Sequence, residues 1–144
     1  MEIKIKYFGE FPEKWKVEKI EKGDWIDLRT AEDVEMFLFD YHKIKLGVGM
    51  ILPEGYEALV VPRSSTFQKW GIIMANGMGV IDNSYSGNDD KWHFPAIAFK
   101  TTFIPRGTRI AQFRIQKKME DVKFVEVSKL NDISRGGFGS TGSM

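Results

Sequence analysis

Cysteine is absent from the 144 residues of this chain, and only two histidines are present. Without thiols the chain has neither a disulfide framework nor a thiolate metal site. No apolar run is long enough to span a bilayer, and the N-terminal stretch MEIKIKYF carries too many charges for a signal peptide. We therefore expect a cytoplasmic protein with no membrane partner.

A strong charge of one sign is also missing. The 21 basic and 20 acidic residues leave a net charge of +1. Proteins that bind long nucleic acid through its phosphates usually carry a clear basic excess. We therefore expect no nucleic-acid partner, and we expect any phosphate to be bound at a local site with few charges. The length fits one domain with one core.

Short alternating stretches dominate the chain and predict β-strands. Ile3 and Ile5 alternate with lysines, and apolar residues recur at every second position from Ile44 to Met50. Turn signals that contain glycine or proline separate these stretches. Further apolar runs cover residues 58–61, 96–99, 109–115 and 122–127. Many short strands at this spacing predict an all-β barrel or sandwich.

One stretch favours a helix instead. Residues 30–33 (TAED) are typical of a helix N-terminus, and apolar residues follow at helical spacing at Val34, Phe37, Leu38 and Tyr41. Periodicity alone therefore predicts a short helix in this stretch.

The last residues, from Ser134 onward, differ from the rest in composition. Residues 134–142 include four glycines and one apolar side chain, too little for burial to order them. One interpretation is a frayed terminus. The other is an arm that closes over an anion, because glycine-rich backbone lets N–H groups converge on phosphate. Such an arm would use Arg135, Ser140 and Thr141 on phosphate oxygens.

The stretch GVIDNSYSG, from Gly79 to Gly87, is the strongest candidate for chemistry. A lone aspartate in a turn is commonly just a turn residue, because its carboxylate bonds its own backbone. Here an apolar approach precedes Asp82, and the aromatic Tyr85 follows three positions later. A hairpin that holds Asp82 at the end of an apolar wall can keep it ionised as a general base toward water.

Two other stretches carry groups that suit phosphate. In the stretch PRSS (62–65), Arg63 offers a planar guanidinium and the serines offer hydroxyl donors. A solvated loop is the alternative interpretation. In the stretch GTRIAQ (107–112), Gln112 can donate to a phosphate oxygen if it faces inward from a strand. A structural hydrogen bond is the alternative there.

The order of these stretches is more specific than any one of them. The chain reads GDWIDL, VPRSS, NGMGVIDNSYSG, GTRIAQ and RGGFGSTG in succession. This order resembles the five motifs of the trimeric dUTP pyrophosphatases (dUTPases). The resemblance implies an all-β, distorted jelly-roll barrel of residues 1–133, with residues 34–41 extended rather than helical. It also implies a homotrimer and a flexible arm of residues 134–144 that reaches a site on a neighbouring subunit.

The resemblance implies that the chain hydrolyses dUTP to dUMP and pyrophosphate, which keeps dUTP low and supplies dUMP for thymidylate synthesis. Asp82 would orient and deprotonate the water that attacks the α-phosphorus. The ring of Tyr85 would lie under the deoxyribose and exclude a 2′-hydroxyl. The hairpin would bind uracil largely through its backbone, with contacts at Asn76, Gly79, Val80 and Ile81, and with Lys91 or Asp90 closing the pocket.

The phosphate contacts follow from the same resemblance. Ser64 and Gln112 match the positions that hold the α- and β-phosphates, and Arg63 and Ser65 belong to the same loop. In the arm, the matching contacts are Arg135, Ser140 and Thr141 on the γ-phosphate, and Phe138 with Gly139 over the uracil. Mg²⁺ is expected on the triphosphate, held by phosphate oxygens and water with no direct protein ligand, and Asp27 would touch its water shell.

The chain departs from the family pattern at three places. Ser84 stands where the family usually has a second aspartate, and Ser65 replaces a usual glycine. The arm is contracted between Arg135 and Phe138, so these two residues need not both reach their usual places. The aromatic stretch KWHF (91–94) is an alternative source of the stacking ring, and simple core packing of its Trp and Phe is the competing interpretation.

Two other functions compete with dUTP hydrolysis. A dCTP deaminase shares the fold and often has Arg-Ser-Ser in its second motif, but its proton-shuttling glutamate has no counterpart in residues 95–99 (PAIAF). A regulatory binding protein would keep the nucleotide site and act by docking a partner protein. The retention of Asp82, Tyr85 and Gln112 argues that hydrolysis persists.

Overall fold

Antiparallel strands make up nearly all the regular structure of residues 1–139 and 142, the part of the chain that the computed structural model describes. The strands are β1 (Lys4–Tyr7), β2 (Ile26–Arg29), β3 (Val34–Met36), β4 (Tyr41–Lys45), β5 (Val48–Ile51), β6 (Tyr56–Pro62), β7 (Ile72–Met74), β8 (Gly79–Ile81), β9 (His93–Ala98), β10 (Thr102–Ile104) and β11 (Arg109–Lys117). The helical elements are short: a 3-10 turn, η1 (Glu13–Trp15), and a helix, α1 (Thr66–Trp70). The prediction of an all-β, jelly-roll-like fold is confirmed.

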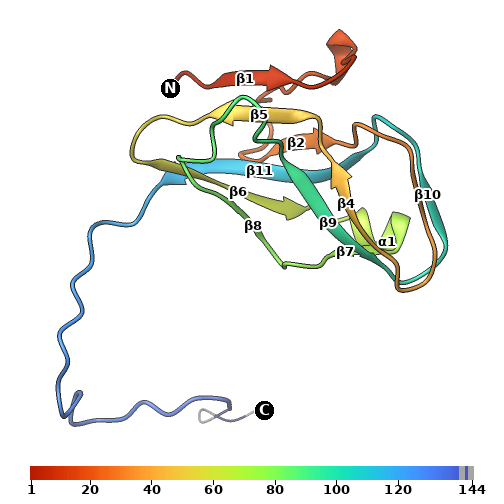
Figure 1. Cartoon of the computed structure of the whole chain (residues 1–144). Coiled ribbons are helices and arrows are strands. Elements are labelled where there is room, and N and C mark those ends of the chain that lie inside the picture. The colour runs from red at the N-terminus through yellow and green to blue at the C-terminus, as the bar shows by residue number, and fades with distance from the viewer. Residues whose placement is uncertain (140–141, 143–144) are drawn as a thin grey trace.

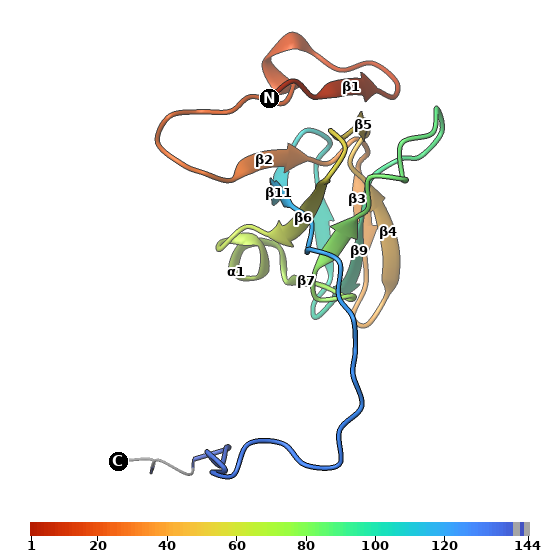
Figure 2. The same ribbon diagram turned by 90° about the vertical axis from the view of Figure 1, so that its left-hand side faces the viewer.

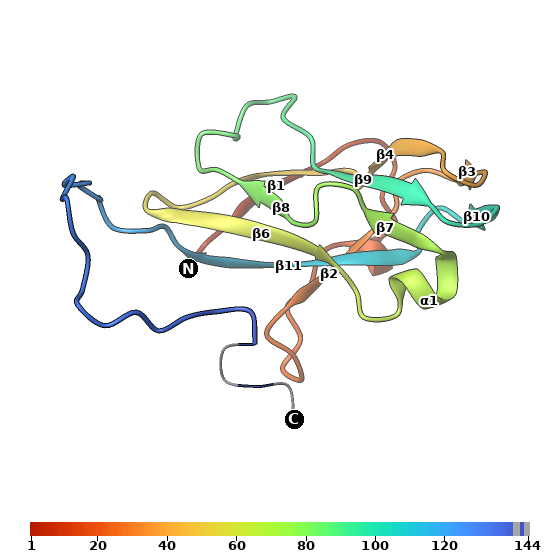
Figure 3. The same ribbon diagram turned by 90° about the horizontal axis from the view of Figure 1, so that it is seen from below.

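The largest sheet has the strand order β2-β11-β6-β8. Its central pair is long: β11 and β6 lie side by side from the Ala111–Pro62 pair to the Lys117–Tyr56 pair (Figure 3). A three-stranded sheet, β4-β9-β7, and the pairs β1-β5 and β10-β3 complete the architecture. The short strand β8 pairs only with the middle of β6, opposite residues 58–60.

The core lies between these sheets and follows the alternation of the strands. In β9, every second side chain is buried, and in β6 the buried positions are Ala58 and Val60. The ring of Trp92 packs edge-on against Phe113 with 5.3 Å between the ring centroids. Trp92 and Phe94 are 1% and 0% exposed. Their rings are therefore core residues, and the hypothesis that one of them stacks on a bound base is wrong.

The predicted helix at residues 34–41 is also wrong, and the extended structure that the family resemblance implies is present. Val34–Met36 form β3, which pairs with β10. A tight turn follows, in which the backbone N–H of Phe37 donates to the Asp40 carboxylate at 2.8 Å and Phe39 has a φ of 68°. Phe37 and Leu38 are exposed. Their helical spacing therefore does not correspond to a buried face.

The N-terminal segment forms a separate layer above the sheets, with β1 paired to β5 (Figure 2). The Phe11 ring lies between the rings of Tyr7 and Trp15, with centroid distances of 4.8 and 6.4 Å. Trp15 in turn covers the turn before β11, where it contacts Gly107 and lies under the Arg106 guanidinium at 5.2 Å. This layer therefore supports the turn that leads into β11.

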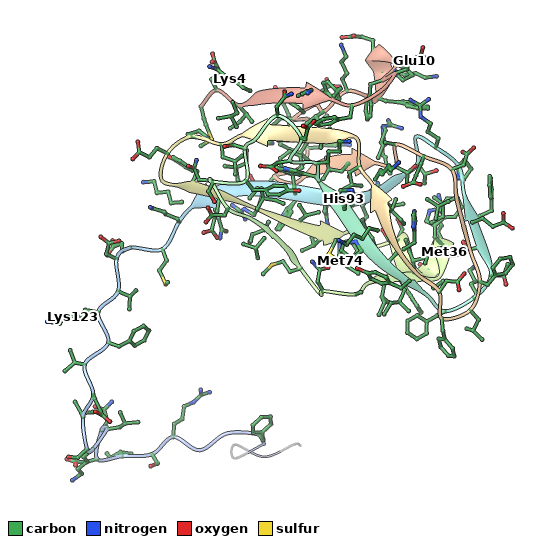
Figure 4. The ribbon with its side chains drawn as sticks, in the orientation of Figure 1. Lys4, Glu10, Met36, Met74, His93 and Lys123 are labelled. Carbon is green, nitrogen blue, oxygen red and sulfur yellow. The ribbon has the colours of Figure 1, made fainter. Side chains whose placement is uncertain are left out.

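The chain beyond β11 leaves the folded body and runs along it at a distance (Figure 1). Residues 118–139 are exposed, and Figure 4 shows Lys123 and its neighbouring side chains clear of the sheets. The apolar run 122–127, expected as a strand, has no strand partner among the described residues. Within the described part of the chain, no helix is long and apolar enough to cross a membrane.

The contact between Trp15 and Gly107 gives the first prediction. A Cβ on residue 107 would lie 2.4 Å from the Trp15 ring, at a φ of +89° that L-residues rarely adopt. We expect Gly107→Ala to lower the free energy of unfolding by about 2–3 kcal/mol, because it adds a steric overlap to backbone strain. Urea denaturation measures this loss.

Gly9→Ala is the matched control, since Gly9 has a φ of +82° but nothing lies within 4 Å of the place that an added Cβ would take. It should show the backbone strain alone, about 1 kcal/mol. Equal losses in the two variants would show that the Trp15 contact does not constrain residue 107.

Candidate active site

Asp82 directly follows β8 and is held by its own turn. Its Oδ1 accepts hydrogen bonds from the Ser84 hydroxyl at 2.6 Å and from the Ser84 backbone N–H at 2.8 Å. Its backbone carbonyl accepts from the Tyr85 N–H at 3.0 Å. Among the described residues, no donor is bonded to Oδ2. One carboxylate oxygen is thus fixed, and the other is open to solvent.

The same hydrogen bonds keep Asp82 ionised. The Ser84 hydroxyl is the largest influence that holds the pKa of Asp82 below its ordinary value, followed by the Ser84 backbone N–H. The Lys118 ammonium lowers this pKa further. A hydrogen bond to the charged form favours that form, so Asp82 is a carboxylate at neutral pH. Ser84, the main departure from the family pattern in this turn, therefore acts directly on Asp82.

Asn83, between these two residues, anchors the turn to the rest of the molecule. Its amide nitrogen donates to the carbonyl oxygens of Leu52 and Pro53 at 2.7 and 3.0 Å. Both acceptors lie at the end of β5, 30 or more residues earlier in the chain. The turn is therefore positioned by a contact that its own sequence does not reveal.

A cavity of about 230 Å³ lies beside this turn. Its lining includes six of the predicted base contacts together: Asn76, Gly79, Val80, Ile81, Tyr85 and Lys91. The Tyr85 hydroxyl donates to the Lys91 carbonyl at 2.7 Å, which closes one wall. Asp90, the alternative to Lys91, instead accepts from the Gly87 N–H at 2.7 Å and shapes the loop.

Two basic residues of this lining were not predicted. Lys43 comes from β4 and His93 from β9, the neighbouring strand of the same antiparallel sheet. Burial is the main influence that lowers the pKa of His93, so its ring is neutral at pH 7. Only the strand pairing brings Lys43 to this cavity, since it lies more than 30 residues before the hairpin in the chain.

The predicted phosphate contacts gather at a second place, around Asp27 of β2. The Arg63 Nε lies 3.1 Å from one oxygen of Asp27, and the Arg109 Nε lies 3.8 Å from the other. Gln112 is the strand partner of Asp27, and its amide donates to the Pro62 carbonyl at 3.2 Å. We call these four residues, Asp27, Arg63, Arg109 and Gln112, the Asp27 cluster.

Arg29, which was not predicted, adds to the positive charge beside this cluster. Its guanidinium donates to the Gly107 carbonyl at 2.9 Å. Burial, followed by repulsion from Arg109, lowers the pKa of Arg29. The electrostatic potential beside the Asp27 cluster is therefore positive, which favours the binding of a multiply charged anion.

The serines of the predicted phosphate loop lie between β6 and α1. Ser64 is exposed, and the Ser65 carbonyl accepts from the Lys69 N–H at 2.9 Å. Buried Thr66 holds the loop, because its hydroxyl donates to the Ile110 carbonyl at 2.7 Å and accepts from the Arg63 N–H at 3.0 Å. Sequence reasoning missed Thr66, whose role appears only through its contact with β11.

Asp82 and the Asp27 cluster lie at opposite ends of β6. The register of β8 on β6 places Asp82 beside Glu57, whereas Arg63 follows the last residue of β6. Glu57 and Arg63 are six positions apart along this extended stretch, which corresponds to roughly 20 Å. One copy of the chain thus does not bring the carboxylate and the arginines to the same phosphate group.

The described arm residues lie apart from both places. Arg135, Phe138 and Gly139 belong to the exposed tail, and Ser140 and Thr141 lie outside the described residues. No group of three or more His, Cys, Asp or Glu side chains that could hold a metal ion exists in the described part of the chain.

Comparisons with known proteins give the family. The family model described as dUTPase matches residues 25–142. The SPbeta prophage-derived deoxyuridine 5′-triphosphate nucleotidohydrolase YosS of Bacillus subtilis is 54% identical, covering 99% of each chain. A deoxyuridine 5′-triphosphate nucleotidohydrolase of Rickettsia typhi is 37% identical, covering 99% of this chain and 97% of that protein. The chain belongs to the dUTPase family.

Solved structures show the same fold. A mutant dUTPase of Staphylococcus bacteriophage 80alpha with dUpNHpp has a TM-score of 0.76 at 21% identity, covering 99% of each chain. The dUTPase of Streptococcus mutans has a TM-score of 0.74 at 19% identity, covering 83% of this chain and 98% of that chain.

The hydrogen bonds from Ser84 give a prediction about Asp82. Ser84→Ala removes the hydroxyl donor, so the pKa of Asp82 should rise toward its ordinary value. NMR titration of the Asp82 carboxyl carbon measures this change. Ser84→Thr, which keeps a hydroxyl, should restore the low pKa. An unchanged pKa in the alanine variant would contradict the contact.

Proposed function

We propose that the chain is a dUTP diphosphatase that hydrolyses dUTP to dUMP and pyrophosphate, with Asp82 as the general base. The observation that carries this proposal is the Asp82 turn: an ionised carboxylate with one open oxygen beside a cavity, in a chain of the dUTPase family. The relative at 54% identity is named for the same substrate. Asp82 would activate the water that attacks the α-phosphorus.

The cavity beside the turn would hold uracil and deoxyribose. The backbone of the hairpin forms one wall of this cavity. Its N–H and C=O groups can hydrogen-bond the donors and acceptors of uracil, whereas bound cytosine would leave some of these groups unpaired. The contacts proposed here are Asn76, Gly79, Val80, Ile81 and Lys91. Tyr85, whose hydroxyl is tied to the Lys91 carbonyl, would present its ring to the sugar and exclude a 2′-hydroxyl.

The Asp27 cluster would hold the phosphates of the nucleotide. Arg63, Ser64, Ser65 and Gln112 are the proposed contacts, since guanidinium, hydroxyl and amide groups all donate to phosphate oxygens. On binding, phosphate would compete with Asp27 for the two arginines.

Mg²⁺ would bind the triphosphate rather than a protein cage. The donor set fits this arrangement: Asp27 is the single carboxylate of the cluster, and Mg²⁺ usually keeps several waters when it binds substrate phosphates. Asp27 would contact its water shell. A related phage dUTPase from phi11 is described with a structural Mg(II) ion.

A homotrimer would complete the site. The separation of Asp82 from the Asp27 cluster within one chain supports a site shared between copies, with Asp82 from one subunit and the phosphate contacts from another. The exposed tail supports the same arrangement, because its apolar run 122–127 is free to pair with a second copy. We propose residues 1–133 as the catalytic domain, in the cytoplasm.

The arm of residues 134–144 would then close over the bound nucleotide. Its proposed contacts are Arg135, Ser140 and Thr141 with the γ-phosphate, and Phe138 and Gly139 with the uracil. Phe138 is fully exposed in the free chain, so its ring is available for stacking.

The first test compares pyrophosphate release from dUTP, dCTP, dTTP and UTP in the presence of Mg²⁺. We expect activity on dUTP alone, and no ammonia from dCTP. Asp82→Asn keeps the side-chain size but removes the base, so kcat should fall by about 10³-fold. A variant that kept most of its rate would contradict the assignment of Asp82 as the base.

Subunit complementation tests the shared site. Asp82→Asn and Arg63→Ala should each be inactive alone. Refolded together at equal amounts, they should recover activity at roughly a quarter of the sites, because mixed trimers place one intact Asp82 beside one intact Arg63. No recovery from mixtures that demonstrably form hybrids would show that each subunit holds its own complete site.

A further inference from the structure

A second, smaller cavity of about 100 Å³ borders the Asp27 cluster on the side of the N-terminal segment. Asp27 and Arg109 are members of the cluster and also line this cavity. The other residues that line this cavity are Lys14, Trp15, Lys16, Glu18, Ile20, Trp25 and Arg29. Most of them precede residue 25, where the match to the family model begins. This cavity is therefore built largely from the part of the chain that the family pattern does not cover.

The charges around this second cavity favour an anion. Its lining includes four basic side chains and two carboxylates. The basic residues are Lys14, Lys16, Arg29 and Arg109, and the acidic ones are Glu18 and Asp27. Asp27 is already paired with Arg63 and Arg109, so it does not neutralise the lysines.

The two lysines of the second cavity differ in their partners. The Lys16 ammonium is 2.9 Å from the Glu13 carboxylate. The Lys14 ammonium makes no ion pair or hydrogen bond with any described residue. Within the described part of the chain, Lys14 is therefore the cation of this cavity that has no polar partner, and its ammonium can bind a ligand.

Lys14 also lies on a segment that is held in place. It belongs to η1, next to Trp15, whose ring packs on Gly107 and Arg106 at the turn into β11. Two residues further on, the backbone N–H of Val17 donates to the Tyr7 hydroxyl at 2.8 Å. Because both flanks are anchored, the backbone of Lys14 is held beside the cavity that Asp27 and Arg109 also line, so that ligand binding costs little backbone entropy.

We propose that Lys14, with Lys16 beside it, extends the phosphate site and binds the terminal phosphates of the substrate and the pyrophosphate product. This inference rests on the proposed function, since it takes the Asp27 cluster as the place where the nucleotide phosphates bind. A triphosphate carries more charge than the two arginines of that cluster neutralise. Lys14, whose charge is not offset by an ion pair with a described residue, supplies additional positive charge at the adjoining cavity.

The test replaces Lys14 by glutamine, which removes the charge and keeps most of the side-chain length. Binding of dUpNHpp, pyrophosphate and dUMP is measured by calorimetry, and KM and kcat are measured with dUTP. Lys14→Gln should weaken dUpNHpp and pyrophosphate by about three- to fivefold, the value of one partly exposed ion pair. KM should rise by a similar factor, while kcat and dUMP binding stay unchanged, because dUMP lacks the terminal phosphates.

Lys22→Gln is the matched control, since Lys22 lies in the same N-terminal segment and does not line the cavity. It should leave all three ligands unaffected. Equal effects of the two substitutions would mean that Lys14 acts only through general attraction of anions, and the proposal would be overturned. Unchanged pyrophosphate binding in Lys14→Gln would overturn it as well. Failure of the proposed function would look different, since the wild-type chain would then not hydrolyse dUTP.

Discussion

Strand β6 is the element on which the candidate site depends. It pairs with β11 along its whole length and with β8 along its middle residues. Through β8 it positions the Asp82 turn at one end, and through its own last residues it leads into Arg63 at the other. Because a strand is stiff and extended, these two groups are kept far apart in one copy. This separation is the observation that supports the proposed site shared between copies.

Charge is arranged differently at the two ends of β6. At the first end, a single carboxylate is kept ionised by two hydrogen bonds from Ser84 and by a nearby lysine. At the other end, Asp27 pairs with two arginines, and Arg29 lies close to them. The first place suits the activation of water, and the second suits the binding of phosphate. The N-terminal layer, held by Trp15, brings further cations to the second place.

The order of five short motifs predicted most of the residues that the structure gathers at the two places of the candidate site. Six predicted contacts line one cavity, and four others lie in or beside the Asp27 cluster. The residues that were missed, Lys43, His93, Arg29 and Thr66, act through neighbours distant in the chain. Local patterns were misleading where long-range pairing competes with them. Residues 34–41 have helical spacing, yet Val34–Met36 pair with β10 as a strand. For Trp92 and Phe94 the sequence indicated only that the side chains are aromatic. Their burial in the core depends on how the sheets pack.

The amino-acid sequence by itself determined the all-β class, the family and the identity of the chemical groups, because alternation and motif order are local properties of the chain. The tertiary structure decided where these groups lie relative to one another. It bonded Asn83 to the residue after β5 and brought Lys43 to the cavity beside the hairpin. It also separated Asp82 from Arg63. These relations depend on strand pairing and register, which form between residues distant in the chain and therefore leave no local pattern in the sequence.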